Sequence, residues 1–264
     1  MTDIQQIITI ARQAGEKILA VYGQDFAVTD KADHSPLTEA DLQAHRHIVA
    51  CLSRLTPDLP VLSEESAPQD IAQRMSWTRY WLVDPLDGTK EFIKRNGEFT
   101  VNIALIDQGV PVLGVVHAPV PDCTWWGEQG RGAFVAQGNA PARAIHVAEP
   151  PAPGQPWRVV GSRSHGTPEL QAFVQRLPGA EMVPVGSSIK LCLVAEGKAD
   201  LYPKLGPTGE WDTAAGQAVV EAAGGQVLSW PDLRPLRYNQ RPDTLINPDF
   251  MVCARPDDYW AGTR

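Results

Sequence analysis

The chain has 264 residues, of which 43% are hydrophobic and 20% are charged, and its formal net charge is −8. This composition is ordinary for a globular protein with a sizeable core, built as one large domain or as two joined subdomains. The acidic balance argues against a nucleic-acid polymer as partner. It does not argue against a small anion, because bound metal ions can supply local positive charge.

The four cysteines lie far apart and include no C-x-x-C pair; they are Cys51, Cys123, Cys192 and Cys253. We therefore expect neither a zinc site nor a disulfide framework, and we interpret the cysteines as small buried hydrophobic residues in a reducing compartment. The N-terminus lacks the pattern of a signal peptide. No apolar run approaches the roughly 20 residues that a membrane-spanning helix needs. These features predict a cytoplasmic protein.

Two helices are expected at the start of the chain, followed by strands. Apolar residues recur at helical spacing from Ile4 to Leu19, and Gly23 should end that helix. A second helix is expected from about Thr38, which has capping-box spacing to Asp41. Strands are then predicted at 61–63, 80–84, 101–106, 110–117, 125–126 and 133–135. Turn residues between the runs from 99 to 135 predict an antiparallel meander.

A proline cluster between residues 151 and 156 predicts a boundary, with an N-terminal subdomain at 1–150 and a C-terminal subdomain at 151–264. Strands and helices alternate after it. The expected strands are 158–161, 182–185, 200–202 and 227–228, and the expected helices are 168–177, 188–196 and 212–223. This alternation predicts a layered α/β architecture.

The segment DPLDGT, from Asp84 to Thr89, indicates the chemistry most directly. An apolar run precedes it, so we expect Asp84 at the end of a strand and Asp87 on the loop that follows. The proline between them restricts the backbone, and Gly88 allows a ligand to approach it closely. Two hard oxygen ligands on such a turn suit a divalent metal ion and a phosphate group.

Three further carboxylates are candidates, and each also has an ordinary structural interpretation. Glu64 belongs to a Glu-Glu pair that could be a polar loop. Asp212 is expected at the start of a helix, where it could simply cap that helix. Asp41 could likewise be a helix-capping residue.

These motifs resemble a known superfamily. DPLDGT, with Glu64-Glu65 upstream and WDTAAG (211–216) downstream, resembles the lithium-sensitive, magnesium-dependent phosphomonoesterases, which include inositol monophosphatases and fructose-1,6-bisphosphatases. SPLTEAD (35–41), GSRSH (161–165) and the run 185–203 are similar to bacterial 3′(2′),5′-bisphosphate nucleotidases of the CysQ type. The resemblance implies an α/β fold, a layered αβαβα sandwich.

The resemblance also implies two or three Mg²⁺ ions in each site. Glu64, Asp84 and the carbonyl oxygen of Leu86 would hold one ion, and Asp84, Asp87 and Asp212 would hold the second. The implied catalytic residues are Asp41, Glu64 and Thr89, with Thr89 orienting the attacking water and Asp41 accepting a hydrogen bond behind it.

Substrate contacts are expected from both halves of the chain. In the first half and at the metal ligands they are Glu64, Leu86, Asp87, Gly88, Thr89 and Asp212. The backbone amides of Gly88 and Thr89 would bind the scissile phosphate at a turn that enters a helix. In the second half they are Arg163, Ser164 and His165 after a strand, and Ser187, Ser188 and Lys190 at a helix start. The alternative for the last three is that a serine caps the helix and Lys190 is solvated.

The expected function is hydrolysis of adenosine 3′,5′-bisphosphate to AMP and phosphate, which the resemblance links to sulfate assimilation. The alternatives are an inositol monophosphatase-like phosphatase and a non-catalytic protein that binds nucleotide or metal. The resemblance leaves open a homodimer and a weak peripheral association with the cytoplasmic face of the inner membrane, for which the sequence offers no anchor.

Overall fold

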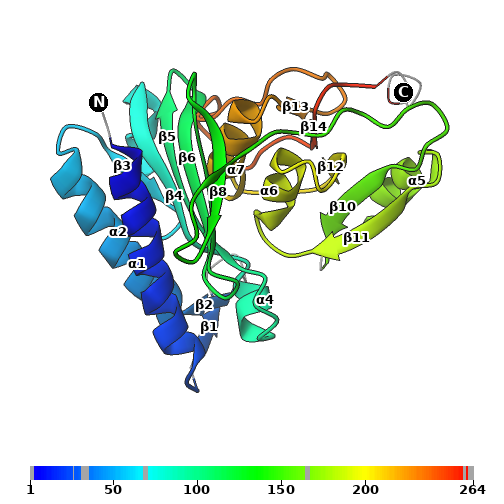
Figure 1. Ribbon diagram of the computed structural model, residues 1–264. Coiled ribbons are helices and arrows are strands. Elements are labelled where there is room, and N and C mark those ends of the chain that lie inside the picture. Colours follow the sequence, from blue (N-terminus) through cyan, green and yellow to red (C-terminus); the bar gives the residue numbers. More distant parts are fainter. Residues whose placement is uncertain are drawn as a thin grey trace.

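Five layers of secondary structure follow one another in the computed structural model, which describes residues 3–25, 27–30, 36–67, 71–163, 167–257 and 260. Helices α1 and α2 cover a seven-stranded sheet, α6 and α7 lie between that sheet and a five-stranded sheet, and α5 covers the outer side of the second sheet (Figure 1). This αβαβα order confirms the expected fold class.

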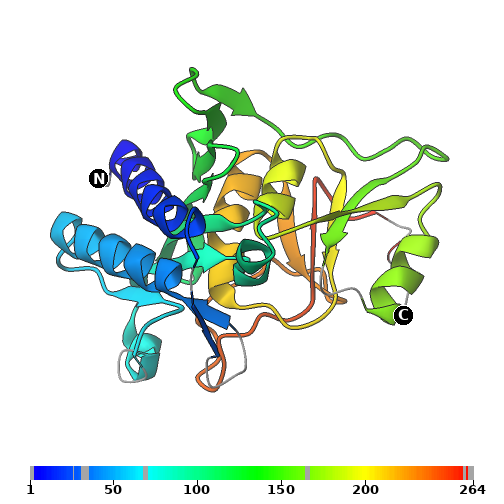
Figure 2. The ribbon, with the colours of Figure 1, turned by 90° about the horizontal axis from the view of Figure 1, so that it is seen from below.

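The outer helices α1 (Ile4–Tyr22) and α2 (Glu39–Leu55) lie side by side, as the view from below shows (Figure 2). A stripe of apolar side chains on α1, including Ile7 and Ile18, is buried. Gly23 follows the last turn of α1, and Thr38 begins α2 with a complete capping box. Both helices were predicted from periodicity and capping residues, and both are confirmed.

The first sheet has the strand order β3-β4-β5-β6-β7-β8-β9. Its strands are β3 (Val61–Ser63), β4 (Arg79–Asp87), β5 (Thr100–Asp107), β6 (Val110–Ala118), β7 (Cys123–Glu128), β8 (Gly132–Gln137) and β9 (Arg143–Ile145). Strands β3 and β4 are parallel, and every later pair is antiparallel. The predicted meander is therefore confirmed, and it extends to β9.

Strand β4 differs from the prediction, because it does not end at Asp84. Asp84 pairs with Asn102 and Asp87 pairs with Thr100, so three steps along β4 match two steps along β5. One extra residue therefore forms a bulge at this point. Bulges re-aim side chains, and this one lies between the two carboxylates of the motif. Asp87 is at the end of the strand rather than on a loop.

The second sheet has the strand order β11-β10-β12-β14-β13. Its strands are β10 (Arg158–Ser162), β11 (Glu181–Val185), β12 (Leu201–Lys204), β13 (Gln226–Ser229) and β14 (Phe250–Cys253). The remaining elements are the β1 (Val28–Asp30) and β2 (Pro36–Thr38) pair, the 3-10 helix η1 (Arg74–Ser76), α4 (Thr89–Ile93), α5 (Pro168–Gln175), α6 (Ile189–Ala195) and α7 (Glu210–Ala222). Strands β1, β2, β9 and β14 were not predicted.

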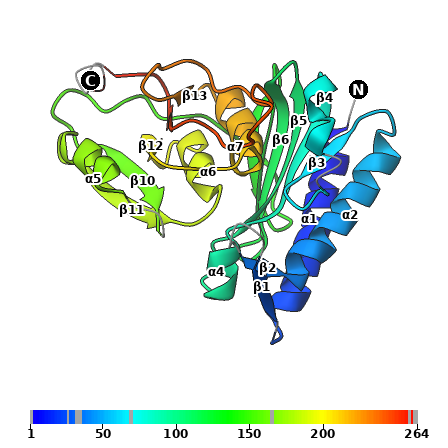
Figure 3. The same ribbon diagram turned by 180° about the vertical axis from the view of Figure 1, so that it is seen from behind.

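Helix α7 packs directly on the first sheet although it belongs to the second half of the chain (Figure 3). A Cβ atom on Gly114 would lie 2.2 Å from the carbonyl oxygen of Ala215, and one on Gly127 would lie 2.7 Å from that of Ala218. The helix begins at Glu210, two residues before the predicted start, with Gly209 as its N-cap. This close approach brings Asp212 to the first sheet. Among the described residues, no helix is long and apolar enough to cross a membrane.

Candidate active site

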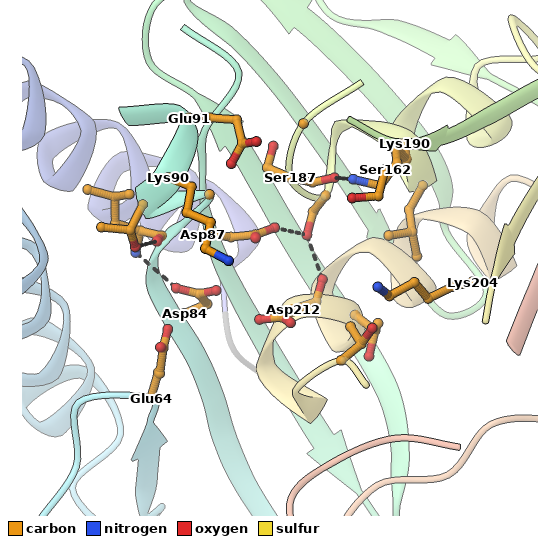
Figure 4. A pocket seen from close by; sticks show the side chains of 18 of the residues that line it. Glu64, Asp84, Asp87, Lys90, Glu91, Ser162, Ser187, Lys190, Lys204 and Asp212 are labelled. Atoms are coloured by element: carbon orange, nitrogen blue, oxygen red, sulfur yellow. Dashed lines mark hydrogen bonds between the residues drawn. The ribbon is translucent and has the colours of Figure 1, made fainter. Parts of the chain in front are cut away.

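A polar cavity of about 250 Å³ lies between the two sheets, where β4, α6, β12 and α7 converge (Figure 4). Most of the predicted site residues line it. They are Glu64, Asp84, Leu86, Asp87, Gly88, Thr89, Ser187, Ser188, Lys190 and Asp212. Ser164 and His165 lie outside the described residues.

Two carboxylates of the DPLDGT motif and one from α7 meet in this cavity. One oxygen from each of Asp84, Asp87 and Asp212 lies within 4.8 Å of the others, close enough to hold a metal ion. Glu64 is near the group, at the end of β3, and its charge raises the pKa of Asp84 and of Asp212. Burial is the largest cause of the raised pKa values of all three aspartates. A divalent cation would relieve this repulsion, and carboxylate oxygens suit such an ion.

Asp212 is held in the cluster from its own helix. It is the third residue of α7, and its Oδ2 accepts a hydrogen bond from the backbone N–H of Gly209 at 2.9 Å. The interpretation of Asp212 as the N-cap residue was therefore wrong about its position. Asp212 lies inside the first turn of the helix, and its carboxylate accepts the hydrogen bond from the N-cap residue. A carboxylate held in this way has a fixed orientation toward Asp84 and Asp87.

Asp41 and Thr89 are in contact behind the cluster. The hydroxyl of Thr89 lies 3.3 Å from Asp41 Oδ1 and 3.3 Å from the carbonyl oxygen of Leu86. It has one proton, and the buried carboxylate is the stronger acceptor. When the Thr89 hydroxyl donates its hydrogen bond to Asp41, the Leu86 carbonyl oxygen keeps its lone pairs for a cation. The second oxygen of Asp41 accepts the N–H and hydroxyl of Thr38 at 2.8 and 2.6 Å.

Ser188 connects two carboxylate positions. Its Oγ lies 2.6 Å from Asp87 Oδ2 and 2.5 Å from the backbone carbonyl oxygen of Asp212, and it accepts a hydrogen bond from Asn102 Nδ2 at 2.8 Å. The side chain makes no capping bond to α6, so the capping alternative is wrong for Ser188. Ser188 is 1% exposed, and its contacts position Asp87 against α7.

Comparison with known proteins identifies the family. The model of the inositol monophosphatase family matches residues 2–254. The chain belongs to the inositol monophosphatase family. This is a family of metal-dependent phosphatases, and the carboxylate cluster of this chain could hold metal ions.

Individual members of the inositol monophosphatase family are similar along nearly the whole chain. The 3′(2′),5′-bisphosphate nucleotidase CysQ of Escherichia coli K12 is 50% identical over 251 residues, which cover 94% of this chain and 98% of that protein. The crystal structure of CysQ from Bacteroides thetaiotaomicron has a TM-score of 0.82 at 43% identity and covers 96% of this chain and 97% of its own. An inositol monophosphatase from Anabaena has a TM-score of 0.71 at 25% identity, covering 98% and 95%.

Two buried lysines line the side of the cavity that faces the carboxylates. Lys190 is 5% exposed, so its interpretation as a solvated residue is wrong. Its Nζ donates to the carbonyl oxygens of Val185 at 3.2 Å and Ser187 at 2.5 Å. Burial lowers the pKa of Lys190 to about 8, against the opposing charge of Asp87.

Lys204, at the end of β12, was not predicted. It is 8% exposed, and its ammonium group makes no hydrogen bond or ion pair with any residue that the structure describes. Its side chain points toward Asp212 and the cavity (Figure 4). Burial lowers its pKa, whereas Asp212, Asp249 and Asp87 act in the opposite direction. The sequence feature that could have identified this residue is a lysine in the otherwise apolar run LYPK.

Arg163 was expected to reach a sugar or a phosphate, but it is paired with Glu98. Its Nε lies 3.0 Å from Glu98 Oε2, and its Nη2 lies 2.7 Å from Oε1. The sequence offered no signal for this pair, because the two residues are 65 positions apart.

Proposed function

We propose that this chain is a magnesium-dependent phosphomonoesterase that hydrolyses adenosine 3′,5′-bisphosphate to AMP and phosphate. The observation that carries the proposal is the meeting of an acidic cluster and two buried lysines in one cavity. A substrate with two phosphate groups needs a metal site for the phosphate that is cleaved and a separate cationic site for the other. The names of the relatives at 50% identity support the same substrate.

The residues are suited to hard divalent ions, because every side-chain donor in the cluster is a carboxylate oxygen. We assign Glu64, Asp84 and the Leu86 carbonyl oxygen to one Mg²⁺, and Asp84, Asp87 and Asp212 to a second. When bound, the ions supply neutralisation of the phosphoryl oxygens and a more acidic attacking water.

The chain's own residues would then orient the reactants. Asp41 accepts the hydrogen bond of the Thr89 hydroxyl, so the oxygen of Thr89 can in turn accept a hydrogen bond from an attacking water and orient it. Glu64 is the second acceptor for that water. The N–H groups of Gly88 and Thr89 at the start of α4 would bind the scissile phosphate.

The lysines are assigned to the phosphate that is not cleaved. The ammonium group of Lys204 has no hydrogen-bond partner among the described residues, and that of Lys190 donates two of its three protons to backbone carbonyls. A dianionic group between them would satisfy both ammonium groups. An inositol ring would offer only neutral hydroxyl groups there and would leave Lys204 without an anionic partner.

The test is phosphate release from adenosine 3′,5′-bisphosphate, inositol 1-phosphate and fructose 1,6-bisphosphate under identical conditions with Mg²⁺. The expected result is the highest kcat/KM for the nucleotide. A preference for inositol 1-phosphate would refute the proposed substrate. Tight nucleotide binding without turnover of any of the three would instead identify a non-catalytic binding protein.

A further inference from the structure

One carboxylate of the first half of the chain holds the ends of two strands in the second half. Glu98 lies between α4 and β5, whereas Arg163 follows β10 and Gly186 follows β11. The guanidinium of Arg163 binds both oxygens of Glu98, at 3.0 and 2.7 Å. The backbone N–H of Gly186 donates to Glu98 Oε2 at 2.8 Å. Three segments therefore meet at one side chain.

The backbone of Glu98 also contacts two turns that line the cavity. A Cβ atom on Gly186 would lie 2.6 Å from the carbonyl oxygen of Glu98. One on Gly88 would lie 3.1 Å from the same oxygen, and Gly88 has a φ of +92°. The turn at Gly88 and the segment 184–188 thus both pack against the carbonyl group of Glu98, and they also approach each other, because a Cβ atom on Gly88 would lie 3.3 Å from the Cβ of Ser187.

Several hydrogen bonds hold the segment 184–188 in place, and the one to Glu98 is made by its middle residue. Arg163 Nη2 donates to the carbonyl oxygen of Pro184 at 2.9 Å. Lys190 Nζ donates to the carbonyl oxygens of Val185 and Ser187, one on each side of Gly186. Ser187 has a φ of +47°, an unusual conformation for a residue with a side chain. The location of the Lys190 ammonium therefore depends on where Glu98 holds Gly186.

Glu98 carries its charge at neutral pH. Burial raises its pKa, but the hydrogen bonds from Arg163 and from the Gly186 N–H and the charge of Arg163 outweigh this effect, so the pKa lies below its usual value. Charge-assisted, bidentate contacts of this kind are geometrically specific.

We propose that Glu98 is a positioning residue for substrate specificity, which sets the lysine side of the cavity at the correct distance from the metal side. Glu98 does not line the cavity, and it acts through Gly186 and Lys190. The inference rests on the proposed function, because it assumes that Lys190 binds the phosphate that is not cleaved.

The experiment compares two substrates in the full chain carrying Glu98→Gln. In this variant the KM for adenosine 3′,5′-bisphosphate should rise about tenfold, because the two sides of the cavity are no longer fixed relative to each other. The KM for p-nitrophenyl phosphate, which has no second phosphate, should change less than about twofold, as should the Mg²⁺ concentration for half-maximal activity. Arg163→Gln, on the exposed partner, should reproduce this pattern, and the double variant should add little to either.

Glu128→Gln is the matched control, because Glu128 pairs with Arg131 at 3.2 Å at the turn between β7 and β8 and lines no part of the active-site cavity. It should change neither KM. Equal losses with both substrates, or unchanged KM values in both Glu98→Gln and Arg163→Gln, would overturn the inference. If the wild-type chain prefers another phosphomonoester, the proposed function fails, and the KM of that ester in the same variants decides the role of Glu98.

Discussion

The hydroxyl of Thr89 lies 3.3 Å from Asp41 Oδ1, although 48 positions separate the two residues. The other oxygen of Asp41 accepts the backbone N–H of Thr38 and completes the cap of α2. One carboxylate thus ties the start of a helix to the turn that follows the metal motif. The sequence left open whether Asp41 caps a helix or orients Thr89. Asp41 makes both contacts, each through a different oxygen of its carboxylate.

Thr89→Val should lower kcat by about two to four orders of magnitude, because valine has a similar shape but cannot hydrogen-bond to a water or to Asp41. Thr89→Ser restores the hydroxyl and should retain activity within about tenfold of the wild type. Steady-state kinetics at saturating Mg²⁺, with melting curves to show that both variants fold, provide the measurement. Full activity in Thr89→Val would exclude Thr89 from the reaction.

Asp87→Asn should leave the fold intact and reduce activity by orders of magnitude, because it removes a negative charge from the ligand set. Burial raises the pKa of Asp87, whereas the charge of Lys190 and the hydrogen bonds from Ser188 and Asn102 oppose this effect, so an uncharged side chain of the same shape should be tolerated at this buried position. Asp107→Asn, at the far end of β5, is the matched control and should behave like the wild type. Near-normal turnover of Asp87→Asn at saturating Mg²⁺ would contradict the metal assignment.

Lys204→Gln should raise the KM for adenosine 3′,5′-bisphosphate by about tenfold or more, because a buried charge-assisted contact to the second phosphate is lost. The KM for p-nitrophenyl phosphate should stay nearly unchanged. Lys198→Gln, on an exposed lysine paired with Glu196, is the control. A variant that binds the nucleotide as tightly as the wild type does would show that Lys204 is not part of the substrate site.

His117 should make the protein less stable in mild acid. Its ring is 3% exposed, contacts Thr124 Oγ1 at 3.0 Å through Nδ1, and packs against Gly15 of α1. Burial lowers its pKa to about 4; Asp122 opposes this effect and Arg12 adds to it. Between pH 6.5 and about 4 the unfolded chain therefore binds the additional proton, and the free energy of unfolding falls as the pH falls.

Urea unfolding at pH 7.5 and pH 5 measures this effect. The contribution of His117 should fall by about 2 kcal/mol between the two pH values. His117→Gln, which can keep a hydrogen bond to Thr124, should lose that part of the pH dependence. Parallel pH profiles for the variant and the wild type would show that His117 titrates normally in the folded protein.

Much of this protein could be predicted from local patterns. The periodicity of α1, the capping box of α2 and the alternation of the meander are short-range features, since each depends on residues a few positions apart. The carboxylates of DPLDGT were equally recognisable, because the residues that determine the chemistry of a turn are consecutive in the sequence. The strands β1, β2, β9 and β14 were missed because they are short and lack a strong alternating pattern.

The sequence by itself determined the carboxylates of the candidate site and the order of the motifs, and its resemblance to a known superfamily implied the αβαβα class. The tertiary structure alone decided how the carboxylates meet. The β4 bulge re-aims Asp87, and the packing of α7 on Gly114 and Gly127 carries Asp212 to Asp84. The tertiary structure also buries Lys204 and pairs Arg163 with Glu98. The reason is physical: these contacts join residues tens of positions apart, and the close approach of whole elements, rather than any local preference, sets their geometry.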